Sequence, residues 1–114
     1  MTIEEYVISY LGAALEGVSV HGSVPHPMPA RFVTVELIGS SRRNMIPSAR
    51  LSVESWGESR ADSAALHETV AAAMLAMISN PEISHVEMST GYNNTDMTTD
   101  RPRYDGTFDV VYLF

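Results

Sequence analysis

Alternation of apolar and polar residues along two segments is the feature that most constrains the fold of this chain. Residues 31–38 read RFVTVELI, with Val33, Val35 and Leu37 in one register and polar residues between them. Residues 49–56 repeat the pattern. A period of two is typical of a strand with one buried and one polar face. The chain is therefore expected to form a sheet that is covered on one side only, unlike a parallel sheet with helices on both faces.

Two other segments carry apolar residues at helical spacing, and each begins with a capping signal. Thr2 and Glu5 form a capping-box pattern at the start of the first segment. Ser59, with Asp62 three residues later, is expected to cap the second helix, which runs to about Ser79. The chain thus contributes two amphipathic helices, whose apolar stripes need a sheet face to exclude water.

Further strands are expected at residues 18–21, 83–88 and 104–114, which gives the order α, β, β, β, α, β, β. The two alternating strands are expected to pair across residues 39–48, a protruding loop too long for a tight turn. Residues 91–102 are expected to form a second, polar loop. The fold class predicted from this order is α+β, with a four- to five-stranded, mostly antiparallel sheet and two helices packed on one face.

Length and composition place the chain among single, soluble domains. With 114 residues and 45% hydrophobic residues, residues 1–114 are expected to form one domain around one core. No apolar run approaches the roughly 20 residues that a membrane-spanning helix needs. Glu4 and Glu5 stand where a secretory signal would carry basic residues, so an intracellular location is expected.

The charge of the chain disfavours nucleic-acid binding as its main function. Fourteen carboxylates against seven basic residues give a net charge of −7, which repels a phosphate backbone. All seven basic residues are arginine. The absence of lysine excludes Schiff-base catalysis, and the absence of cysteine excludes disulfides and thiolate metal sites.

No arrangement of residues with a specific catalytic, cofactor-binding or metal-binding signature is present. The histidines at positions 21, 26, 67 and 85 lack the spacing of metal ligands. Asp96, Asp100 and Asp105 do not follow the order of a calcium-binding loop. The serines lack a nucleophile-elbow motif, and the segment GSSRR lacks the lysine of a phosphate-binding loop. The chain is therefore expected to have no enzymatic activity, cofactor or metal.

Two stretches of the chain carry a resemblance to a known family. In the first, RLSVESWGESRADSAALHETVAAAMLAM, a strand ending in Trp56 leads through a short turn into an alanine-rich helix. In the second, TDRPRYDGTFDVVYLF, the R-x-R-Y segment from Arg101 to Tyr104 opens the closing strand. With a helix near the N-terminus and a polar loop between them, these stretches resemble the tail terminators and head-to-tail joining proteins of long-tailed bacteriophages and prophages. The resemblance in order covers nearly the whole chain.

The resemblance implies a structural role in virion assembly. It implies a ring of six copies that caps the tail tube and docks onto the head connector. The partners would be further copies of the chain, the tail-tube protein and the head-completion or connector protein, with DNA at most passing through the lumen. The location would be the host cytoplasm during assembly and then the head–tail junction of the virion. Loops 39–48 and 91–102 are the candidates for contacts with two different neighbours.

Six residues are the candidates for interface or loop-anchoring roles: Arg42, Arg43, Trp56, Arg101, Arg103 and Tyr104. Simpler interpretations remain for several of them. Arg42 and Arg43 also suit a solvated loop tip, and Trp56 also suits core packing. Arg103 also suits an exposed ion pair with Asp105 or Asp62.

Two other functions remain open at this stage. One is a different neck or tail-completion component, which the sequence does not separate from a terminator. The other is a small ligand-binding or regulatory α+β domain, which would need a pocket lined by convergent polar groups.

Overall fold

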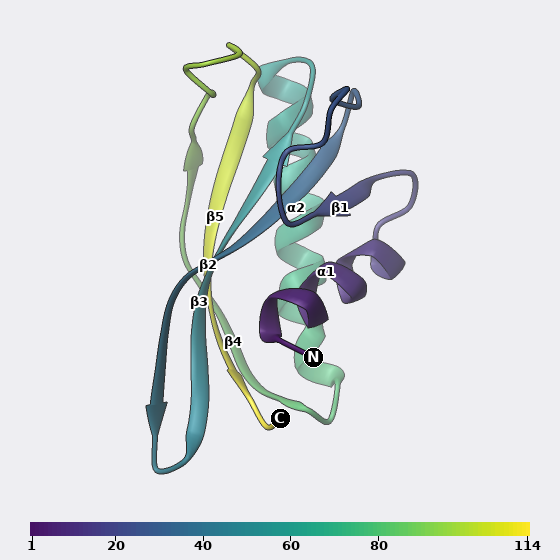
Figure 1. Ribbon diagram of the computed structural model, residues 1–114. Helices are drawn as coiled ribbons and strands as arrows, with labels where there is room; N and C mark the ends of the chain where they lie inside the picture. The colour runs from purple at the N-terminus through teal and green to yellow at the C-terminus, as the bar shows by residue number, and fades with distance from the viewer.

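The computed structural model describes all 114 residues, and it confirms the predicted α+β class. A mixed five-stranded sheet has the order β1-β2-β3-β5-β4, and only the β1–β2 pair is parallel. Both long helices cover the same face of this strongly twisted sheet (Figure 1). In chain order the elements are α1 (Ile3–Ala14), β1 (Ser19–His21), β2 (Phe32–Arg43), β3 (Ile46–Trp56), α2 (Arg60–Ala76), the short 3-10 helix η1 (Met77–Ser79), β4 (Ile83–Asn93) and β5 (Arg103–Tyr112).

Both helices begin where their capping residues predict. The Thr2 hydroxyl accepts the Glu5 backbone N–H, and the Glu5 carboxylate accepts the Thr2 backbone N–H, which completes the capping box of α1. The Ser59 hydroxyl accepts the Asp62 backbone N–H at the start of α2. Neither helix has the length and apolar character that crossing a membrane requires.

The core lies between the helices and the inner face of the sheet, which we define as the face toward α1 and α2. Val33, Val35, Leu51 and Val53 point into it, as predicted, whereas Leu37, which was expected on the same face, is exposed. Helix α2 supplies the apolar stripe that faces β3, β4 and β5. The core consists of Ile3, Val7, Leu11, Leu15, Val18, Val33, Val35, Ala49, Leu51, Val53, Leu66, Val70, Met74, Met77, Ile83, Phe108 and Val110.

The predicted loop at residues 39–48 is wrong, because these residues continue the two strands as a β-hairpin. Arg43 pairs with Ile46, so only Asn44 and Met45 form the turn. Their φ angles of 52° and 69° fit a type I′ turn, whose twist matches that of the flanking strands. A bulge at Ile38 shifts the register ahead of the hairpin. The alternation of apolar and polar residues stops at the hairpin because the hairpin extends beyond the core. The sequence pattern therefore did not indicate that the strands continue.

The second predicted loop is also shorter than the sequence indicated. Strand β4 continues to Asn93, so the segment between β4 and β5 spans residues 94–102. Most of β4 is exposed, and its apolar pattern therefore ends before the strand does.

Gly91 and Gly106 pair across β4 and β5 and make room for His67, since a Cβ atom at Gly91 would lie 2.8 Å from the His67 Nε2 atom.

The molecule is elongated, with principal extents of 43 × 25 × 23 Å. The β2–β3 hairpin projects at one end, and the 94–102 loop lies at the opposite end (Figure 1). The two predicted protrusions are therefore separated by the length of the molecule.

Candidate assembly surfaces

The hairpin at one end of the molecule is the most prominent surface feature, and we call residues 37–50 the arm. Arg43 and Arg42 are neighbours on β2, so their side chains project from opposite faces of the arm. The guanidinium of Arg42 donates to the Met45 carbonyl at 3.4 Å. The hydroxyls of Ser41 and Ser48 lie 2.6 Å apart across the strands. These contacts stay within the arm, and both arginines remain exposed.

Large apolar side chains are exposed along the same arm. Met45 is 82% exposed at its tip, and Leu37, Ile38 and Ile46 are also exposed. Pairing with β1 ends at Thr34, so the arm has no strand on its outer edge. The arm thus combines cationic side chains, apolar side chains and an open strand edge.

A groove next to the arm is the second surface at this end. It lies between α1, the turn that follows η1 and the end of the chain, and it has a volume of about 690 Å³. The ring of Phe114 stands 5.1 Å from that of Tyr6 and separates the groove from the arm. The residues that line the groove are Met1, Tyr6, Ser9, Tyr10, Ala13, Asn80, Glu82 and Phe114.

The polar atoms of the groove's tyrosines already have partners. The Tyr10 hydroxyl donates to the Ala73 carbonyl at 2.7 Å, and the Tyr6 hydroxyl accepts from the Asn80 side chain at 2.8 Å. Burial raises the pKa of Tyr10 above its ordinary value. The groove therefore offers aromatic surfaces, with two charged groups, the Glu82 carboxylate and the amino group of Met1.

Arg101 holds the opposite end of the molecule together. Its guanidinium donates to the carbonyls of Pro29, Ala30 and Gly57, at 2.9 to 3.2 Å. It also lies over the ring of Phe32, 5.9 Å from the centroid. A single side chain therefore joins three segments that are far apart in the sequence, and its contacts are those of a loop-anchoring residue.

Arg103 and Trp56 lie together on the outer face of the sheet, the face away from the helices. The Arg103 guanidinium stands 4.9 Å from the Trp56 ring centroid and 3.1 Å from a Glu54 carboxylate oxygen. Its second carboxylate neighbour is Asp96, at 3.9 Å. The partners predicted from the sequence, Asp105 and Asp62, are wrong. Arg103 forms its ion pair with Glu54 because Trp56 is the cross-strand neighbour of Arg103, and Glu54 is the next residue of β3 on the same face.

Trp56 is 2% exposed, although it does not belong to the main core. Its ring stacks on Phe32 with centroids 5.0 Å apart, and its Nε1 atom donates to the Thr34 hydroxyl. Thr34 in turn donates to Glu54. Burial raises the pKa of Glu54 above its ordinary value, while Arg103 and the Thr34 hydrogen bond act in the opposite direction. In a single copy, Trp56 is therefore a packing residue of the outer face.

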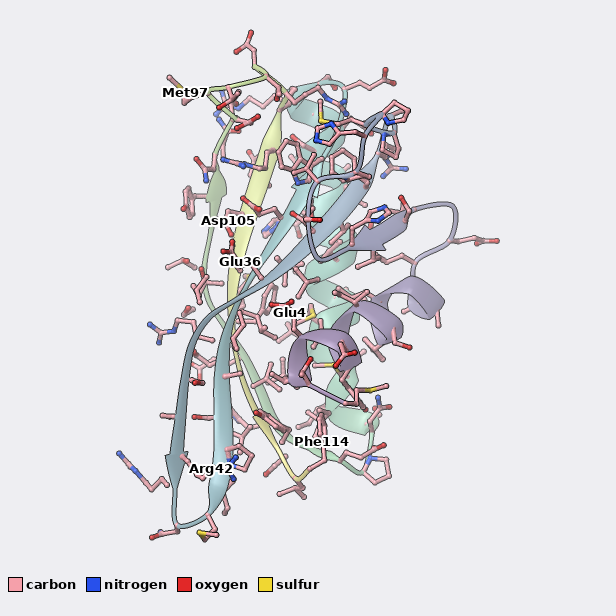
Figure 2. The ribbon with its side chains drawn as sticks, viewed as in Figure 1. Glu4, Glu36, Arg42, Met97, Asp105 and Phe114 are labelled. Atoms are coloured by element: carbon pink, nitrogen blue, oxygen red, sulfur yellow. The ribbon has the colours of Figure 1, made fainter.

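The remaining candidate, Tyr104, lies on the inner face. Its ring centroid stands 5.5 Å from that of His67 on α2. Of the six predicted residues, the structure brings together Trp56, Arg101 and Arg103 at one end. Arg42 and Arg43 lie at the other end, as the label of Arg42 shows in Figure 2.

The acidic residues considered as metal ligands have separate roles in the structure. Asp96 accepts the backbone N–H and the hydroxyl of Thr99, which lowers the pKa of Asp96 below its ordinary value. Asp105 accepts the Ser52 hydroxyl on the sheet. No group of three or more histidine, aspartate or glutamate side chains is arranged to hold a metal ion.

The aromatic groove has no counterpart among the residues selected from the sequence. In the sequence, Tyr6 and Tyr10 lie in the first helical segment, and Phe114 ends the strand predicted at residues 104–114, which in the structure ends at Tyr112. The only available signal was the presence of two tyrosines four residues apart on one helix face. The structure was needed to place Phe114 beside them.

Comparisons with known proteins give one informative result. No protein-family model matches the chain, and no curated protein has a similar sequence. Among solved structures, a chain of the virion of a native gene transfer agent particle has a similar fold, with a TM-score of 0.61 and 14% sequence identity. The match covers 93% of this chain and 83% of that chain. At this identity the likeness establishes a shared fold.

Proposed function

We propose that this chain is a structural protein of a phage-like virion, and that it forms a ring, of six copies, at the end of the tail tube. The observation that carries the proposal is the shared fold with a chain of a gene transfer agent virion over 93% of the present chain. The ring, its copy number and its position as a tail terminator come from the sequence resemblance. The partners are the tail-tube protein and the head-completion or connector protein.

The surfaces of the molecule support an assembly role. A ring component at a junction contacts its own copies and two different neighbours, and it therefore needs several separate surfaces. Here the arm and the groove lie at one end, and the loops held by Arg101 lie at the other. The polar groups of the outer face bind each other and leave no convergent set for a substrate. These features favour a structural protein over an enzyme.

Electron microscopy of the purified protein tests this proposal. The protein is imaged by negative stain at high concentration, alone and after mixing with the tail-tube protein of the same genome. We expect rings, or tubes capped at one end, together with a matching mass by light scattering. A protein that stays monomeric and does not bind the tube contradicts the proposal.

The same experiment separates the terminator from another neck component. A terminator stops growth of the tube, so adding it during tube polymerisation shortens the tubes. A ring that binds the connector but leaves tube length unchanged identifies a different neck protein.

A further inference from the structure

We propose that the tip of the arm of one copy docks in the aromatic groove of a second copy. This inference rests on the proposed ring and names the two surfaces that form its subunit contact. The arm supplies the side chain of Met45 with Arg43 beside it, and the groove supplies aromatic rings with Glu82 beside them.

The conformation of Met45 is the first observation behind this proposal. Its φ angle is 69°, a region that favours glycine, and the second position of a type I′ turn is most often glycine. A methionine at this position strains the backbone and exposes 82% of a large apolar residue to water. Strained residues of this kind concentrate at functional sites. Because Met45 stays this exposed even though it borders a shallow hollow with Leu113 and Phe114 of its own chain, we infer that another molecule covers it.

The groove has the chemistry that suits a methionine. Its walls include the rings of Tyr6, Tyr10 and Phe114, and a thioether packs favourably against aromatic rings. Each of the two tyrosine hydroxyls already makes a hydrogen bond within its own chain, which reduces the cost of covering it with an apolar side chain. An unbranched side chain also adapts to an open groove of about 690 Å³.

Charge complementarity identifies the occupant as another copy of this chain. The arm contains Arg42, Arg43 and Arg50 and no carboxylate, so its charge is +3. The rest of the chain has four arginines and fourteen carboxylates, a charge of −10. At the groove, the Glu82 carboxylate attracts a cationic tip and the amino group of Met1 offsets part of that attraction, so the complementarity lies mainly between the arm and the acidic body as a whole.

In a single copy, the tip does not line the groove of its own chain, because Met45 borders a separate hollow on another side of Phe114. From Ser48 onward β3 pairs with β5, which holds the arm in line with the sheet. Arm and groove lie at the same end of the molecule, where Arg42 and Phe114 are labelled in Figure 2. Because they are separate surfaces, each copy can offer its arm to one neighbour and its groove to the other. Repetition of such a contact gives a closed ring when the rotation closes.

Cross-linking between two different variants tests the contact. The chain has no cysteine, so Met45→Cys and Ala13→Cys each introduce a single thiol, one at the tip and one at the groove. Mixed in equal amounts and oxidised, they are expected to form a disulfide-linked pair that contains one copy of each. Met97→Cys, which is 94% exposed at the far end of the molecule, is the control and should not link to Ala13→Cys.

Charge reversal provides the second test. Arg43→Glu and Glu82→Arg alone are each expected to weaken self-association about tenfold, and the double variant to restore most of it. Both positions are exposed, so circular dichroism should show an unchanged fold. If the double variant self-associates as weakly as the single variants, the arm–groove contact is overturned.

The outcomes distinguish the inference from the proposed function. Rings in the microscope without a cross-link between Met45→Cys and Ala13→Cys show that the ring uses another contact, and they overturn the inference alone. A protein that forms no ring, alone or with the tail tube, overturns both. Rings with the specific cross-link and charge rescue support both.

Discussion

Among single residues, Arg103 shows how a half-buried charge is tolerated on the outer face. Its side chain is 17% exposed, as is that of Glu54, with which it forms an ion pair. It also donates to the Asn94 carbonyl at 2.7 Å and stacks over Trp56. Burial raises the pKa of Glu54, so the protonated acid is favoured by folding. The stabilisation that the raised pKa of Glu54 contributes is fully present below the ordinary pKa of 4.5. It is lost as the pH rises from 4.5 through the pKa of Glu54 in the folded protein.

We predict that Arg103→Met destabilises the protein more at pH 7 than at pH 4.5. Removing the cation leaves the ionised Glu54 without its partner, at an expected cost of about 1–3 kcal/mol near neutral pH. The cost should shrink as the carboxylate takes up a proton. Urea denaturation at both pH values measures the free energy of unfolding.

Two variants serve as controls for this prediction. Arg50→Met removes an exposed ion pair with Asp109 and should have a smaller effect. In a Glu54→Gln background, Arg103→Met should lose its pH dependence. If Arg103→Met lowers the free energy of unfolding equally at pH 7 and pH 4.5, Arg103 stabilises the fold through Trp56 and Asn94 alone.

Among the elements, the arm differs from the rest of the sheet in what holds it together. Strands β2 and β3 are stabilised over residues 32–36 by the core on one face and by the Trp56 network on the other. Beyond the bulge at Ile38, the tip of the hairpin has only its ladder, the Ser41–Ser48 contact and the hydrogen bond from Arg42 to the Met45 carbonyl. On its open edge, the Leu37 N–H donates to the Glu4 carboxylate at 2.9 Å, which anchors the base of the arm to α1. The tip therefore depends mainly on its turn.

We predict that Met45→Gly raises the free energy of unfolding of the isolated protein by about 1 kcal/mol. Glycine adopts the observed φ without steric strain, and Asn-Gly is the preferred pair of a type I′ turn. Urea denaturation measures the change, and Met97→Gly is the matched control. Met97 has an ordinary φ, so the same substitution there should not stabilise the protein.

The same variant should also weaken self-association, because it removes the apolar side chain of the tip. A more stable protein that assembles less well is the expected signature of a residue kept for contact and not for folding. If Met45→Gly destabilises the protein, the side chain has a role within its own chain that the structure does not show.

For the whole molecule, the separation of charge along the long axis is the main property. The arm has a charge of +3 and the remainder −10, although the sequence as a whole reads simply as acidic. Copies therefore attract one another through the arm and repel elsewhere. Salt screens exposed charges over about 8 Å at physiological ionic strength, so assembly should respond to salt.

We predict that raising sodium chloride from about 50 mM to about 500 mM weakens self-association, because the attraction between arm and body is screened. Sedimentation velocity at several salt concentrations measures the distribution of species. Arg43→Glu serves as the control, since its association should depend less on salt. Association that strengthens with salt would instead indicate a contact dominated by apolar surface.

The sequence by itself determined the elements whose local signals agree with their environment. The capping residues Thr2 and Ser59 mark helix starts because their hydrogen bonds are made within four residues. Alternation in residues 31–38 and 49–56 predicted the two central strands because the residues of one face point into the apolar core while the other face carries mostly polar residues. The α+β class, with both helices on one face, followed from the same patterns.

Only the tertiary structure decided the features that depend on residues distant in the sequence. The tip of the arm and the end of β4 carry no alternation because neither borders the core, and pairing with a neighbouring strand defines them instead. Arg101 and Arg103 find carbonyls and a carboxylate from other segments, which no local pattern encodes. The groove exists only where Phe114 meets Tyr6. Local hydrogen bonding and periodicity are properties of the chain, whereas these contacts are properties of its packing.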